Sequence, residues 1–178
     1  LKSRLGHELS LLTRDEARFG EMRALLPFAA AIMDLHERQR RMETVVPEAT
    51  ALSLAKVAEQ AAAATRLLDS VAARPTKIVA YRAAAEILSL RETLRRWYDF
   101  YAGYDPLFTW WSKSTYEKTA EGLSKYAAAL REKVVGVRPG EDDPIIGDPI
   151  GRAGFIEDLA YEMIPYTPEE LIRIAERE

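Results

Sequence analysis

Residues 78–102 read IVAYRAAAEILSLRETLRRWYDFYA and carry the clearest secondary-structure signal in the chain. Apolar side chains recur there every three or four positions, which is the spacing of one face of an α-helix. That face consists of Ile87, Leu90, Leu94, Trp97 and Tyr101. Gly103 follows at the position expected for a left-handed C-terminal cap. The stretch therefore predicts one long helix with a buried face.

The same spacing continues towards the N-terminus in two stripes, which we expect to face a core. They consist of Leu5, Leu9 and Leu12, and of Phe28, Ile32 and Leu35. Pro27 lies between them and lacks the backbone donor that a continuous helix needs. We therefore expect a break or kink near Pro27, and a second helix that runs to about Thr44.

An alanine-rich helix is predicted from Pro47, which suits the first helical turn, to Ala73, where Arg74-Pro75 ends it. We expect its apolar side to consist of Leu52, Val57, Leu67, Leu68 and Val71. Ser114-Thr115-Tyr116-Glu117 has the spacing of a capping box. A further helix is expected from there to about Val135, with Gly136 as its stop.

Glycine and proline dominate residues 136–151, a composition that interrupts regular structure. A short helix is expected at 152–163, and Thr167-Pro168-Glu169-Glu170 predicts the start of another. We expect that last helix to be frayed or held by a neighbouring chain, and the natural sequence to continue, because Leu171, Ile172 and Ile174 lack an evident partner.

These patterns predict an all-α fold of long antiparallel helices with one Gly/Pro-rich loop. We interpret residues 1–178 as a single helical region, a fragment of a larger domain. Its parts are long helices at 1–135, a loop at 136–151 and short helices at 152–178.

Charge and composition narrow the classes of function. With 25 Lys and Arg against 28 Asp and Glu, the net charge is −3, so no single-signed field indicates nucleic acid as a partner. The absence of cysteine excludes disulfides and thiolate metal sites. No apolar run reaches the roughly 20 residues of a membrane span. The chain carries no targeting signal, and we expect any such signal to lie upstream of it, so the compartment of the parent protein, cytoplasmic or secreted, stays open.

Both histidines begin an incomplete zinc-peptidase motif, H-E-x-x-H, in which two histidines one helical turn apart bind zinc and the glutamate serves as base. Leu11 follows His7-Glu8, and Arg40 follows His36-Glu37, where the second histidine is required. We therefore predict no catalytic and no metal-binding residue in this chain, and interpret both histidines as lying on solvated helix faces.

Residues 97–111 contain all three tryptophans among five other aromatic residues. Large aromatic side chains with polar tips can line a cleft that grips an extended ligand, or can pack the junction between two helices. Junction packing is the favoured interpretation. In either case Asp105-Pro106 begins a turn, because the aspartate can accept from the N–H groups that follow.

Three blocks, Gly103–Trp111, Ile145–Gly151 and Tyr161–Leu171, together resemble the bacterial and fungal domain-of-unknown-function 885 family. Members of that family are large helical proteins that resemble zinc metallopeptidases. The resemblance implies part of a larger helical zincin-like fold, with an H-E-x-x-H helix and a further glutamate downstream of the region seen here. It transfers no metal ligand or catalytic base to this chain.

The resemblance implies a role for the chain as scaffold or as one wall of the substrate channel in a zinc-dependent peptidase or carboxypeptidase-like hydrolase. Zinc would then belong to the full-length protein, and the partners would be the rest of the parent chain and a peptide substrate. The substrate-binding candidates are Tyr104, Asp105, Trp110, Trp111 and Asp148. The alternative is a non-enzymatic helical scaffold or protein-interaction module.

Overall fold

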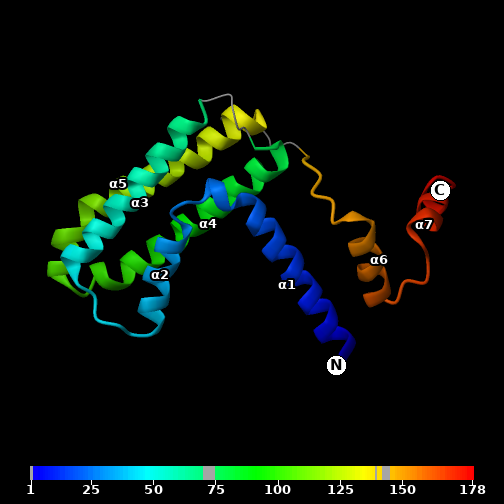
Figure 1. Cartoon of the computed structure of the whole chain (residues 1–178), viewed down its shortest axis with the longest axis horizontal. Helices are drawn as coiled ribbons and strands as arrows, with labels where there is room; N and C mark the ends of the chain where they lie inside the picture. Colours follow the sequence, from blue (N-terminus) through cyan, green and yellow to red (C-terminus); the bar gives the residue numbers. More distant parts are fainter. Residues whose placement is uncertain (1, 70–74, 139, 142–144) are drawn as a thin grey trace. The chain divides into compact units, whose positions relative to one another are not determined.

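A computed structural model describes residues 2–69, 75–138, 140–141 and 145–178, with side chains from residue 4 onward. Within these ranges the fold is all-α and contains no strand, which confirms the predicted class (Figure 1). The α-helices are α1 (Lys2–Met22), α2 (Ala29–Arg40), α3 (Pro47–Leu67), α4 (Lys77–Ala102), α5 (Pro106–Leu130), α6 (Gly151–Tyr161) and α7 (Pro168–Ala175), with a 3₁₀ turn η1 (Arg23–Leu25) and a π-helical turn η3 (Arg131–Val135).

Internal contacts group the chain into two compact units. The end unit combines Leu1–Glu21 with Ile146–Glu178, and the middle unit is Met22–Ile145. No described helix is long and apolar enough to cross a membrane. The single helical region over residues 1–178 stays a prediction.

The middle unit is built around α5, which packs against both α3 and α4 (Figure 1). Helices α4 and α5 form an antiparallel hairpin, whereas α3 and α5 run in the same direction. Their parallel course follows from paired contacts along both helices, since Thr119 meets Leu54 and Gly122 meets Ala61 further along. The Thr119 hydroxyl lies 2.9 Å from the Leu54 carbonyl oxygen and is fully buried, so it joins α3 to α5 inside the core.

The predicted face of α4 is confirmed. Four of its five residues are at most 3% exposed, namely Ile87, Leu90, Leu94 and Trp97, and Tyr101 is half-buried. The stripe of Phe28, Ile32 and Leu35 on α2 is buried as well. A break between α1 and α2 occurs around Pro27, as expected. These faces supply the apolar burial that holds the middle unit together.

The expected apolar side of α3 is partly wrong. Leu52 and Leu67 are 66% and 71% exposed, while small residues such as Ala61 and Ala64 face the core. A methyl group added to Gly122 would lie 3.9 Å from Ala61 Cβ, an ordinary van der Waals contact, so α3 and α5 pack directly against each other through small residues here. The expected contribution of Val71 and the stop at Arg74 lie outside the described residues.

The start of α5 corrects the predicted capping box at Ser114–Glu117, which lies inside the helix. The helix begins at Pro106, where Asp105 caps it. An aspartate cap followed by proline satisfies the first free N–H groups and presets the backbone, so the helix starts earlier than the hydroxyl signal indicated. Gly136 ends the following π-helical turn with φ +90, as predicted, whereas Gly103 has φ −80 and is not a left-handed cap.

The end unit has little apolar core. Among its described residues Leu159 is the buried hydrophobic side chain, and Gly154 of the same helix is buried as well. A polar seam, which we define as His7, Ser10 and Arg14 of α1 against Glu157, Asp158 and Tyr161 of α6, joins the two helices. The expected core stripe of Leu5, Leu9 and Leu12 is wrong, because these residues are 56–65% exposed and α6 occupies the polar face of α1 instead.

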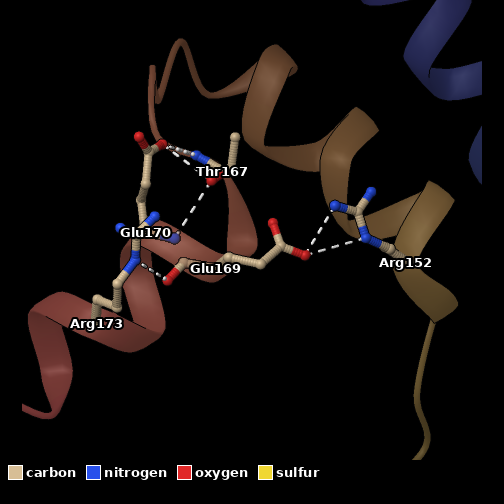
Figure 2. A network of polar contacts seen from close by, with 5 residues as sticks. All are labelled: Arg152, Thr167, Glu169, Glu170 and Arg173. Carbon is tan, nitrogen blue, oxygen red and sulfur yellow. Dashed lines mark hydrogen bonds and ion pairs between the residues drawn. The ribbon is translucent and has the colours of Figure 1, made fainter.

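Helix α7 starts as the sequence predicts. The Thr167 hydroxyl accepts from the Glu170 N–H, and the Glu170 carboxylate accepts from the Thr167 N–H at 2.8 Å (Figure 2). Arg152 of α6 donates to Glu169 at 2.8 Å and ties the first turn of α7 to α6 (Figure 2). These contacts lower the pKa of Glu169, chiefly through Arg152, and that of Glu170, chiefly through the Thr167 N–H.

Candidate functional site

Asp105 is committed to the backbone at the turn between α4 and α5. Its Oδ1 accepts from the N–H groups of Leu107 at 2.9 Å and Phe108 at 3.1 Å. The Thr109 hydroxyl lies 2.8 Å from the Ala102 carbonyl oxygen, which links the end of α4 to the first turn of α5. Hydrogen bonds and the helix dipole both stabilise a carboxylate at a helix N-terminus, so these contacts stabilise the turn between α4 and α5.

The buried half of the aromatic segment packs the helix junction. Trp97 is 2% exposed and Phe108 fully buried, and their rings meet edge to face with centroids 5.5 Å apart. Tyr98 stacks on Tyr116 of α5 at 3.8 Å. Burial raises the pKa of both tyrosines above the ordinary value. The junction interpretation is therefore confirmed for these residues.

The other half of the segment faces outward and forms what we call the aromatic corner: Tyr104, Leu107, Trp110 and Trp111. Tyr104 is 88% exposed and Trp110 72%, and the Trp110 and Trp111 rings meet edge to face at 5.0 Å. Leu107, Trp110 and Trp111 are spaced at i, i+3 and i+4, so they share one face of α5. The structure thus brings two of the predicted substrate-binding side chains, Trp110 and Trp111, into contact, while Tyr104 lies exposed in the chain directly before the Asp105 cap.

Asp148 belongs to the end unit. Its carboxylate lies 3.3 Å from the Arg18 guanidinium of α1. Both side chains are about one-third exposed, so the pair is partly shielded from water. The contact gives Asp148 a structural role within its own unit, a role that the sequence pattern did not indicate.

The two histidines differ in their surroundings. His36 is half-buried on α2, and Glu37 beside it pairs with Arg40 at 3.0 Å. His7 is not on a solvated face as expected, since its side chain is 14% exposed and its ring stacks on Tyr161 at 3.9 Å. His7 is shielded from solvent because it belongs to the polar seam, where α6 covers this face of α1. Among the described residues, no cluster of three or more His, Asp or Glu side chains is arranged to hold a metal ion.

The polar seam is the feature that sequence reasoning missed. Arg14 donates to Asp158 at 2.7 Å, and this hydrogen bond lowers the pKa of the Asp158 carboxyl and raises that of Arg14. His7, Ser10 and Arg14 lie at i, i+3 and i+7, a spacing that marks one helix face. The sequence contains that spacing, but the leucine stripe on another face of α1 predicted that the apolar side of the helix would be the packed one.

Comparisons with known protein families, with characterised proteins and with solved structures find no match to this chain.

Proposed function

We propose that the chain is a catalytically silent helical region of a zinc-dependent, peptidase-like hydrolase of the domain-of-unknown-function 885 family. In this proposal the middle unit forms part of the wall of a peptide channel, and the aromatic corner is the surface that meets the substrate. The zinc ion and the H-E-x-x-H helix would belong to the remainder of the parent protein, which the resemblance implies.

The aromatic corner is the observation that carries the proposal. Its exposed tryptophans stand on a helix start that is fixed by the Asp105 cap and by the buried Trp97 and Phe108 rings beneath it. A fixed aromatic surface loses little conformational entropy when it binds an extended chain. Tyr104 and the tryptophan N–H groups add donors that can meet peptide carbonyl oxygens.

The first experiment compares the full-length gene product with the 178-residue chain. We expect zinc and peptide hydrolysis in the full-length product, with activity lost on chelation, and neither in the isolated chain. The gene should encode H-E-x-x-H and a later glutamate after Glu178. Zinc-dependent hydrolysis by the isolated chain would contradict the silent role, and a gene without the motif would contradict the peptidase parent.

The second experiment tests the aromatic corner itself. Trp110→Ala in the full-length product should raise KM for a peptide about 2- to 10-fold, since one aromatic contact contributes roughly 0.5–1.5 kcal/mol. Zinc content and kcat should change little. Leu52→Ala is the matched control, because Leu52 is a comparably exposed apolar residue of α3 outside the corner. Equal effects of the two substitutions would remove the corner from the substrate path.

The alternative function is a non-enzymatic interaction module, and exposed apolar residues of the end unit favour it. Leu9 and Leu12 of α1 are each 65% exposed, and Phe155 and Ile172 line an open groove between α6 and α7. Apolar surfaces of this kind often mark protein–protein contacts. A full-length product with neither bound zinc nor hydrolytic activity would favour this module over the peptidase.

A further inference from the structure

A separate cavity of about 100 Å³ lies in the middle unit, away from the residues of the aromatic corner. Its walls come from α2, from the extended loop at 43–46, from the first turns of α3 and from the end of α4. Leu35, Val45 and the rings of Trp97 and Tyr101 give it apolar sides. It is open to solvent on one side, so a group carried by a larger molecule can enter.

Two buried polar side chains in this wall lack hydrogen-bond partners among the described residues. Thr50 is 7% exposed and Trp97 2%, and the structure gives neither Thr50 Oγ1 nor Trp97 Nε1 a protein partner. Both atoms retain a small solvent-accessible surface. Both residues line the cavity. The indole N–H can only donate, so it requires an acceptor.

The charges at the rim are already compensated. Arg38 donates to Glu43 at 3.1 Å and lies 3.9 Å from Asp34, while Arg41 lies 2.9 Å from Glu43. An anion entering the cavity would gain no free positive charge and would face the carboxylate of Glu43, which lines the cavity. The charge balance therefore favours a neutral acceptor.

We propose that this cavity binds a neutral carbonyl group, with its oxygen accepting from Trp97 Nε1 and Thr50 Oγ1 and its apolar part against Leu35 and Val45. The volume is below that of cavities of roughly 150 Å³ that hold benzene, so the bound group has about four to six heavy atoms. A small amide fits this description. The site is independent of the proposed function, since it uses no residue of the aromatic corner.

Such a group could be a free small amide or the acylated end of a peptide, and both present the same chemistry. N-methylacetamide represents the first source and an N-acetyl-dialanine methylamide the second. Tighter binding of the peptide assigns the cavity to a peptide end. Binding of N-methylacetamide alone assigns it to a free small molecule.

The three tryptophan indole N–H signals in a ¹H–¹⁵N NMR spectrum provide the test in the whole chain. Trp110→Phe and Trp111→Phe assign the two exposed indoles, which leaves the third signal for Trp97 without a change to the core. We expect N-methylacetamide to shift the Trp97 signal saturably, with the other two almost unchanged. Acetate at equal concentration should shift it far less.

Substitutions then locate the contact. Thr50→Val keeps the side-chain shape and should weaken binding about 3- to 10-fold, as loss of one hydrogen bond predicts. Thr65→Val is the matched control, because its hydroxyl donates to the Ala61 carbonyl oxygen within the same helix and does not line the cavity. Ser53→Leu should fill the cavity and abolish the saturable shift.

Three outcomes overturn the proposal. One is a parallel, unsaturated shift of all three indole signals, which indicates a solvent effect and a cavity that holds only water. Another is acetate binding as tightly as the amide, which makes the site an anion site. The last is an equal effect of Thr50→Val and Thr65→Val on amide binding.

Discussion

Tyr126 shows how a polar atom is accommodated within the core of the middle unit. The residue is 1% exposed, its ring meets Phe28 edge to face, and its hydroxyl donates to the Leu25 carbonyl oxygen at 3.0 Å. Tyr126→Phe should lower the free energy of unfolding by about 1–2 kcal/mol, because the Leu25 carbonyl is left unpaired. Urea unfolding at pH 7 measures this difference.

The same tyrosine predicts an alkaline response. Burial raises the pKa of Tyr126 to about 12 from its ordinary 10.0. A raised pKa stabilises the folded state fully below pH 10, and that contribution is lost as the pH rises towards 12. The Phe variant has no proton to lose, so its stability should fall less across this range. A parallel decline of both proteins would assign the alkaline loss to other groups.

At this residue scale the sequence identified some roles and missed others. It predicted that Asp105 caps the N–H groups after it, since that role needs only neighbours in the chain. Periodicity assigned Trp97 to the buried face of its helix, but it gave no such assignment for Trp110, because which side of α5 the neighbouring helices cover depends on packing. The pairing of Asp148 with Arg18 joins residues far apart in sequence and left no local pattern.

At the scale of the helix, the capping-box pattern occurs twice, at Thr167–Glu170 and at Ser114–Glu117, and the two copies predict opposite effects of alanine substitution on stability. Thr167 truly caps α7, so Thr167→Ala should cost about 0.5–2 kcal/mol of local stability and increase amide exchange throughout that eight-residue helix. Ser114 lies inside α5 and caps nothing, so Ser114→Ala should be neutral or slightly stabilising. Amide hydrogen exchange of the two variants measures both effects. A loss of protection in α5 caused by Ser114→Ala would mean that Ser114 does cap a helix, as the sequence predicted.

Methionines end two helices where the sequence predicted longer ones. Met42 follows α2 and Met163 follows α6 with φ near +55, and in each case the next N–H donates back to the last turn. The sequence placed the ends at about Thr44 and at Met163, because methionine is a good helix former and signals no stop. Left-handed backbone is a conformation that glycine adopts without strain.

Met163→Gly should therefore stabilise the end of α6 by about 1 kcal/mol, since a left-handed non-glycine residue costs roughly that much. The side chain is 88% exposed, so little packing is lost. Thermal unfolding and amide exchange at Ile164 measure the effect. Met33→Gly inside α2 is the opposing control and should destabilise, because there the backbone is helical.

At the scale of the whole molecule, the sequence predicted the all-α class and the Gly/Pro-rich loop but not the grouping of the helices. Periodicity reports which residues of one helix share a face and says little about which helix covers that face. The end unit joins the first and last segments of the chain through the polar seam, and such long-range pairs leave no repeated spacing in the sequence.

The two units rest on different interactions, and this predicts that acid affects them separately. In the end unit Asp158, Glu169 and Glu170 all have lowered pKa, and Leu159 is its buried apolar side chain among the described residues. The middle unit also pairs carboxylates such as Glu92, but on exposed faces above a large apolar core.

A lowered carboxyl pKa contributes stability above its ordinary value, here 3.8 for aspartate and 4.5 for glutamate, and that contribution is lost as the pH falls below it. Amide NMR signals of α6 and α7 should therefore collapse below about pH 4, while those of α4 persist. Asp158→Asn cannot gain a proton, so it should weaken the end unit at neutral pH and flatten its acid response. The apolar core around α4 has no carboxylate for acid to protonate. Simultaneous loss of the α4 and α6 signals would therefore contradict the prediction and mean that the two units unfold together.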